Sequence, residues 1–166
     1  MEALISTPAT ITEILIGKLF PYFVLGLLVT IGATLLAITV FNLPFRGSWL
    51  SLMMVSAVFM VPALGQGLMI SSLTHNQFIA AQVALITGFL PSFLLSGFLF
   101  EIDSMPAAIR LITNIIPARY FIVCLQTLFL VGDSWHVFIP NMLSMLAIGT
   151  VFFIVASRKT KKSLDR

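Results

Sequence analysis

Charged residues are scarce in this chain of 166 residues, and their scarcity excludes a water-soluble domain. Only 9% of the residues are charged, against about 25% in an ordinary soluble domain, and 59% are hydrophobic. The mean hydropathy of +1.09 implies more apolar surface than a core of this size can hide. Its natural solvent is lipid, where a membrane-spanning helix needs roughly 20 mostly apolar residues. The charged residues between Leu19 and Ala156 are Arg46, Glu101, Asp103, Arg110, Arg119 and Asp133.

Cysteine is nearly absent from the chain, and most of the basic residues lie in its C-terminal tail. Cys124 is the single cysteine, which excludes an internal disulfide and a cysteine metal cluster. The formal charge of +3 does not indicate a nucleic-acid partner, because the basic residues collect in the C-terminal tail. The opening Met1–Ala3 is acidic and has no basic leader before an apolar run, so it does not match a signal peptide.

Four long apolar stretches predict four membrane-spanning helices, at residues 22–41, 49–73, 78–100 and 137–156. Residues 1–20 contain a capping box and a mixed helix that we expect at the membrane surface, with the Lys18 ammonium among the headgroups. Pro21 should bend the chain between this surface helix and the first span, because it removes an amide and crowds the Gly17 carbonyl.

Residues 101–132 are too interrupted for a simple span. A helix that begins near Pro106 is predicted to break at Pro117, and the second piece, of fourteen residues, reaches roughly 21 Å against a hydrocarbon core of roughly 30 Å. Joining both pieces into one span would bring Arg110 and Arg119 into or near the membrane, at a cost of several kcal/mol. We therefore expect a re-entrant or interfacial helical hairpin.

The parity of the spans predicts the topology. Four spans return both termini to one side, and the basic tail at residues 157–166 places that side in the cytoplasm by the positive-inside rule. The hairpin then lies outside. The predicted fold is an all-α integral membrane protein that forms a single transmembrane domain over residues 1–166.

The chain shows no motif for catalysis or for cofactor binding. Gly17-Lys18 is followed by Leu19, and Thr12 stands where a P-loop needs its first glycine, so the chain is not expected to bind ATP or another cofactor. His75 and His136 fall in loops predicted on opposite sides, which excludes a shared metal. A solvated acid and a helix cap account for Glu101 and Asp103 better than a paired-carboxylate or cation site does.

Small residues form stripes on two of the predicted spans, where they allow close helix packing in lipid. One stripe is Gly26, Thr30, Ala33 and Ala37, and the other is Ala84, Gly88, Ser92 and Ser96. Packing alone explains these residues, although Gln66, Gln82, Ser92 and Ser96 are also suited to line a polar route. We keep both interpretations, pathway or packing, for Gln66, Gly88, Ser92 and Ser96. The absence of an ionisable residue within any predicted span argues against a proton- or ion-coupled carrier.

Two segments of the chain resemble the permeases of type-2 ABC exporters. Residues 1–8 and 13–22 are similar to the cytoplasmic segment of that family, in which a Gly-Thr-x-Glu-x-Leu-x-x-Thr-Pro stretch precedes a Gly-Lys-x-x-Pro-Tyr entry into a membrane helix. Residues 96–100, 105–106 and 116–121 are similar to the family's extracellular re-entrant hairpin. Such permeases normally have six spans and a large external domain, so the chain resembles a C-terminal portion: a fragment, a split gene product or a truncated gene.

The resemblance implies a mechanism in which a separate ATPase subunit supplies the energy and a second permease protomer completes the assembly in the bacterial inner membrane. By motif, the segment coupled to the ATPase contains Glu2, Leu4, Thr7 and Pro8. The elbow that passes movement to the first span contains Gly17, Lys18 and Pro21. The outer hairpin contains Pro106, Pro117, Arg119 and Tyr120.

Three functions remain open at this point. The leading one is the membrane subunit of an exporter for a drug, lipid, polysaccharide or ion. The second is a small membrane scaffold or assembly protein without transport activity. A lipid-modifying enzyme is third, because the predicted spans lack clustered acids and histidines.

Overall fold

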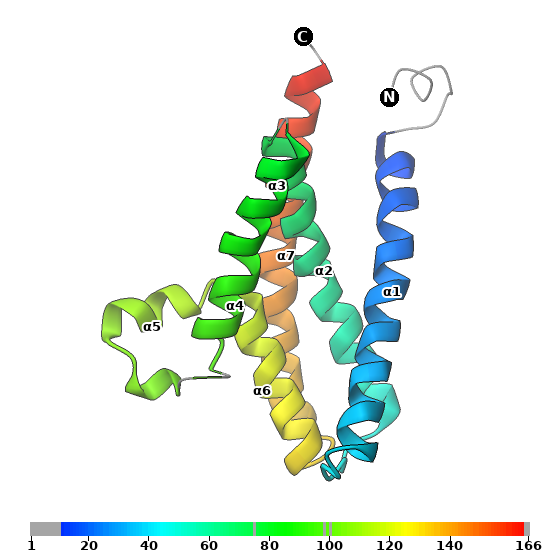
Figure 1. Cartoon of the computed structure of the whole chain (residues 1–166), viewed down its shortest axis with the longest axis vertical. Coiled ribbons are helices and arrows are strands. Elements are labelled where there is room, and N and C mark those ends of the chain that lie inside the picture. Colours follow the sequence, from blue (N-terminus) through cyan, green and yellow to red (C-terminus); the bar gives the residue numbers. More distant parts are fainter. Residues whose placement is uncertain (1–10, 75, 98, 100, 165–166) are drawn as a thin grey trace.

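The computed structural model describes residues 11–74, 76–97, 99 and 101–164, and the described residues form helices and contain no strand (Figure 1). Four helices are long and apolar enough to cross a membrane, which confirms the predicted all-α membrane fold: Ile16–Thr39, Trp49–Leu73, Gln77–Leu95 and Trp135–Arg158. The helical elements in chain order are α1 (Ile11–Thr39), α2 (Trp49–Leu73), α3 (Gln77–Ala84), η2 (Leu85–Phe89), α4 (Leu90–Leu95), η3 (Ile102–Ser104), α5 (Ala107–Thr113), α6 (Pro117–Leu130) and α7 (Trp135–Leu164).

The helices α2 and α7 form the centre of the molecule and run side by side in the same direction (Figure 1). Two glycines let their backbones approach closely. A Cβ added to Gly149 would lie 2.9 Å from the Pro62 nitrogen, and one added to Gly65 would lie 3.2 Å from the Phe152 Cβ. Close approach of this kind is what small residues provide between helices in lipid.

The helix α6 packs against α2 and α7 and completes the core. The buried cluster that joins the three helices consists of Leu52, Val55, Cys124, Leu128, Phe138 and Met145. Phe59 of α2 also stacks on Phe121 of α6, with ring centroids 4.2 Å apart. The core therefore depends on an element shorter than a full span.

The helix α1 stands to one side of this core and contacts α2 (Figure 1). It is one helix from Ile11 to Thr39 with Pro21 inside it, so the expected surface helix and the first span are joined without a break. A proline removes a single helical hydrogen bond, and residue 17, whose carbonyl the ring approaches, is a glycine. The helix can therefore continue through Pro21.

The third membrane-crossing helix is assembled from α3, η2 and α4, and it ends at Leu95 rather than at the expected residue 100. Its middle segment, Leu85–Phe89, is a turn of π-helix, and Pro91 follows directly in the first turn of α4. None of these three elements contains a fully buried residue. This helix lies on the bundle without contributing to its core.

The helices α5 and α6 meet at an angle of 82° across the break at residues 114–116. Pro117 starts α6, and α5 projects sideways from the bundle (Figure 1). The first residues of α1 and the last residues of α7 lie at the same end of the molecule, and the α1–α2 and α6–α7 loops lie at the opposite end (Figure 1). A chain that crosses a bilayer four times has this arrangement of ends.

The contact between Gly149 and α2 generates a prediction about stability. Gly149→Ala should lower the melting temperature in detergent, because its Cβ would press on the α2 backbone at Pro62, and overpacking of this kind costs about 1–3 kcal/mol. Gly32→Ala is the matched control, since its Cβ meets no atom within 4 Å, and it should leave the melting temperature unchanged or slightly raised. Equal melting temperatures for the two variants would contradict the close packing of α2 on α7.

Candidate functional site

The residues expected to couple the chain to an ATPase, Glu2, Leu4, Thr7 and Pro8, lie outside the residues that the structure describes. The expected elbow residues Gly17, Lys18 and Pro21 are described, and all three are exposed on α1. The coupling and elbow roles therefore stay predictions.

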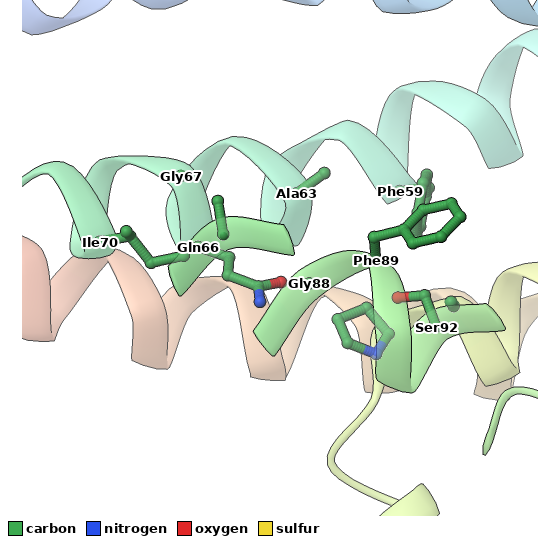
Figure 2. Close-up of a pocket in the computed structure, with 11 residues that line it drawn as sticks. Phe59, Ala63, Gln66, Gly67, Ile70, Gly88, Phe89 and Ser92 are labelled. Carbon is green, nitrogen blue, oxygen red and sulfur yellow. The ribbon is translucent and has the colours of Figure 1, made fainter. Parts of the chain in front are cut away.

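Three of the four residues assigned to a pathway or to packing share one cavity. Gln66 of α2, Gly88 of η2 and Ser92 of α4 line an open cavity of about 310 Å³. Figure 2 shows the Gln66 side chain beside Gly88, with Phe59, Phe89 and Ser92 toward the other end of the cavity. The cavity walls are largely apolar, so this space suits a molecule that is mostly apolar and carries few polar groups.

The start of the hairpin helix α6 closes one wall of the same cavity. Pro117 and Ala118, both buried, line the cavity together with residues of α2 and α4. Spacing along the chain does not reveal this meeting, because Pro117 is far from Gln66 in sequence and was assigned to the outer hairpin. The π segment at Leu85–Phe89 that brings Gly88 to the cavity was also missed.

The fourth residue of that group, Ser96, lies apart from this cavity at the C-terminal end of α4. Its hydroxyl is buried and has no hydrogen-bond partner among the described residues. Ser96 borders a separate cavity of about 370 Å³ that Glu101 and Gln126 also line. The described structure therefore divides the second small-residue stripe between two environments.

Arg119 and Tyr120 hold the bend between α5 and α6. The Arg119 guanidinium donates to the Thr113 hydroxyl at 2.8 Å, and the Tyr120 hydroxyl donates to the Asn114 carbonyl at 2.9 Å. Arg119 also donates to the Asn114 side chain. Pro106 precedes α5 as its N-cap residue. These contacts fix the C-terminal end of α5 against the first turn of α6.

The first small-residue stripe faces a groove between α1 and α6. Thr30, Ala33 and Ala37 line this groove of about 370 Å³ together with Phe121 and Leu125. The Thr30 hydroxyl donates to the Gly26 carbonyl of its own helix at 3.0 Å, so it is engaged within α1. The groove is therefore almost entirely apolar in character.

Asp133 joins the α6–α7 loop to the start of α2, a contact that the sequence did not indicate. Its carboxylate accepts a hydrogen bond from the Ser48 amide at 2.9 Å, and Ser48 is the N-cap of α2. The Gly47 amide donates to the Leu128 carbonyl at 2.9 Å beside it. Asp133 lies in a loop outside the membrane-spanning segments. Its pKa is lowered, chiefly by the hydrogen bond from the Ser48 amide and to a lesser extent by one from the Ser51 hydroxyl. The positive end of the α2 dipole also favours a carboxylate at this position.

The described residues contain no group of three or more histidine, cysteine, aspartate or glutamate side chains placed to hold a metal ion. His136 is exposed, and His75 lies outside the described residues. Asp103 faces Arg110 at 3.6 Å on the exposed surface, and Glu101 is exposed. The described part of the chain has two largely apolar cavities bounded by helices, one beside Gln66 and one between α1 and α6, and a more polar cavity beside Ser96.

The family described as ABC-2 family transporter protein matches residues 1–158. The chain is 50% identical, over 99% of its length, to the probable multidrug ABC transporter permease YbhS of Escherichia coli K12. It is 25% identical, over 96% of its length, to the probable multidrug ABC transporter permease YbhR of the same strain. It is also 25% identical over 99% of its length to the inner membrane transport permease YhhJ of that strain. The chain spans 44% of the length of each of these relatives. No solved structure matches the chain significantly.

The Asp133 contact predicts a pH-dependent stability. Because the pKa of Asp133 is lower in the folded chain than its ordinary value of about 4, its charge stabilises the fold above that pH and this contribution is lost as the pH falls through the lowered pKa. Asp133→Asn should therefore have a lower melting temperature than the unmodified chain at pH 7, and the difference should shrink below about pH 4.

The matched control is Asp103→Asn, which removes an exposed carboxylate that faces Arg110 and should change the melting temperature little at pH 7. Thermal unfolding in detergent between pH 7 and pH 3 measures both variants. A difference for Asp133→Asn that stays constant over this range would contradict the account of its carboxylate.

Proposed function

The chain belongs to the ABC-2 family of transporter proteins, and from that premise we propose that it forms the part of an exporter permease that carries its last four membrane helices. The observation that carries the proposal is the family match over residues 1–158, together with 50% identity to a permease. The proposed activity is outward movement of a substrate across the membrane, driven by ATP that a separate subunit hydrolyses.

The substrate we propose is a largely apolar molecule with few polar groups. The cavity between α2, α4 and α6 supports this class, because its apolar walls carry the Gln66 amide and the Ser92 hydroxyl as polar groups. YbhS and YbhR are named as probable multidrug permeases, which agrees with such a substrate.

The partners we propose are an ATPase subunit on the cytoplasmic side and a second permease protomer in the membrane. No Asp, Glu, Lys or Arg lies in α1 after Lys18, in α2, in α3 to α4, or in α7 before Arg158, and this scarcity of charge supports an energy source outside these helices. We place Leu4 and its neighbours against the ATPase, and Gly17, Lys18 and Pro21 in the elbow that leads from this contact into α1. The chain itself is proposed to carry no catalytic activity.

The orientation we propose has both termini in the cytoplasm and residues 101–132 toward the outside, in the inner membrane of a bacterium. Two features support this orientation. The first residues of α1 and the last residues of α7 lie at the same end of the molecule (Figure 1), and basic residues follow Ala156. The α5–α6 hairpin would then help to close the outer side, held in its bent form by Arg119 and Tyr120.

The experiment that tests this function is affinity purification of the tagged chain in mild detergent, followed by mass spectrometry. We expect an ATPase with a P-loop and a second permease copy to be recovered with the chain. Leu4→Asp should reduce recovery of the ATPase several-fold and leave the permease copy in place, because it puts a charge into the proposed coupling contact.

The control is Ser163→Asp, which adds the same charge to the tail at the other terminus and should leave recovery of the ATPase unchanged. Recovery of the chain without an ATPase and without a second permease copy, across several detergents, would contradict the exporter proposal. That result would favour a membrane scaffold instead.

A further inference from the structure

The third membrane-crossing helix contains a proline that removes one donor from its backbone hydrogen-bond ladder. In a regular α-helix the Thr87 carbonyl would accept from the amide of residue 91, but that residue is Pro91 and has no amide hydrogen. The backbone takes a π turn at Leu85–Phe89, where the Leu90 amide donates to the Leu85 carbonyl. In lipid an unpaired carbonyl costs several kcal/mol, so a donor from another helix stabilises the Thr87 carbonyl.

Gln66 supplies that donor from the neighbouring helix. Its side-chain amide nitrogen lies 3.1 Å from the Thr87 carbonyl oxygen and donates to it across the cavity between α2 and η2. Figure 2 shows the Gln66 amide reaching from α2 toward Gly88, the residue after Thr87. A Cβ added to Gly88 would have the Gln66 amide nitrogen as its nearest neighbour, at 3.4 Å. Gly88 therefore lies at van der Waals distance from the Gln66 amide.

Among the described residues, the third helix also contacts α2 through α3 and α6 through α4. The elements α3, η2 and α4 contain no fully buried residue. Gly67, the neighbour of Gln66, has nothing within 4 Å of its Cβ position, and the cavity of about 310 Å³ lies between the two helices. Among the described residues, the hydrogen bond from the Gln66 side chain to the Thr87 carbonyl joins α2 to this helix.

We propose that Gln66 is a positioning residue that acts as a latch: its amide holds the third helix at the π segment, and release of the amide lets α4 swing away from α2. The π turn and Pro91 form the hinge, because the helical hydrogen-bond ladder is already interrupted there. The movement widens the cavity lined by Gln66, Gly88, Ser92 and Pro117. The latch rests on the hydrogen bonding of this chain and stands whether or not the chain transports a substrate.

The test measures the distance between α2 and α4 in the whole chain, reconstituted in lipid nanodiscs. Spin labels are placed on cysteines at Leu50 and Leu94, both exposed, in a Cys124→Ala background, and the distance distribution is recorded by double electron–electron resonance. Gln66→Met keeps the length of the side chain and removes the donor. The population with α4 displaced should rise about threefold to tenfold relative to the closed population, as expected for the loss of one interhelical hydrogen bond.

The decisive variant adds Pro91→Ala to Gln66→Met. Alanine gives residue 91 a backbone amide, which in the regular α-helical register pairs with the Thr87 carbonyl, so the double variant should return toward the distribution of the unmodified chain; a merely space-filling role for Gln66 does not predict this return. Gln82→Met, at an exposed position of α3, is the matched control and should leave the distribution unchanged.

Three results would overturn the proposal: an unchanged distribution for Gln66→Met, an equal effect of Gln82→Met, or a displaced population that Pro91→Ala does not reduce. Membrane insertion of each variant is measured in parallel. If Gln66→Met fails to insert, insertion of the double variant supports the latch, and failure of both contradicts it.

Discussion

Backbone hydrogen bonding in lipid is the constraint on which this structure depends, because the bilayer core offers no donors or acceptors to an unpaired group. Each of the four membrane-crossing helices nevertheless contains a proline: Pro21, Pro62, Pro91 and Pro140. The chain accommodates them in different ways. Pro62 is buried where Gly149 brings the α7 backbone close, whereas the carbonyl left free by Pro91 receives the Gln66 amide from another helix. The surroundings of Pro62 are tightly packed, whereas the Gln66 bond near Pro91 is a contact that can be exchanged.

This difference divides the described molecule into a tightly packed centre and less tightly held sides. The centre is α2, α6 and α7, which share the buried cluster around Cys124 and Phe138. The helix α1 and the third helix lie on either side of it and border apolar cavities. A permease needs parts that keep their packing and parts that change it, since packed cores switch between discrete arrangements rather than deforming continuously. In the proposed exporter, α1 and the third helix are the parts that move.

Local pattern predicted much of the fold, because span length and hydropathy are properties of consecutive residues. Such patterns predicted the four spans. They also singled out Gln66, Gly88 and Ser92, which line one cavity in the structure, as residues of a pathway or of a packed face. The π segment and the continuous helix through Pro21 did not, because each depends on how a lost backbone bond is compensated in three dimensions. The Asp133 contact with Ser48 joins residues 85 positions apart, and the meeting of Pro117 with Gln66 is equally non-local, so neither has a sequence signature.

In the proposed exporter, α2 and α7 stay fixed while α1 moves with the state of the ATPase subunit. Spin-label distances in nanodiscs, with the co-purified ATPase present, test it most directly: one pair joins Leu50 of α2 to Leu143 of α7, and the other joins Leu50 to Leu28 of α1, all at exposed positions. The account predicts that trapping the ATPase with ATP and vanadate shifts the α1–α2 distance and leaves the α2–α7 distance unchanged. A shift in the α2–α7 distance, or the same α1–α2 distance with and without the trapped nucleotide, would contradict it.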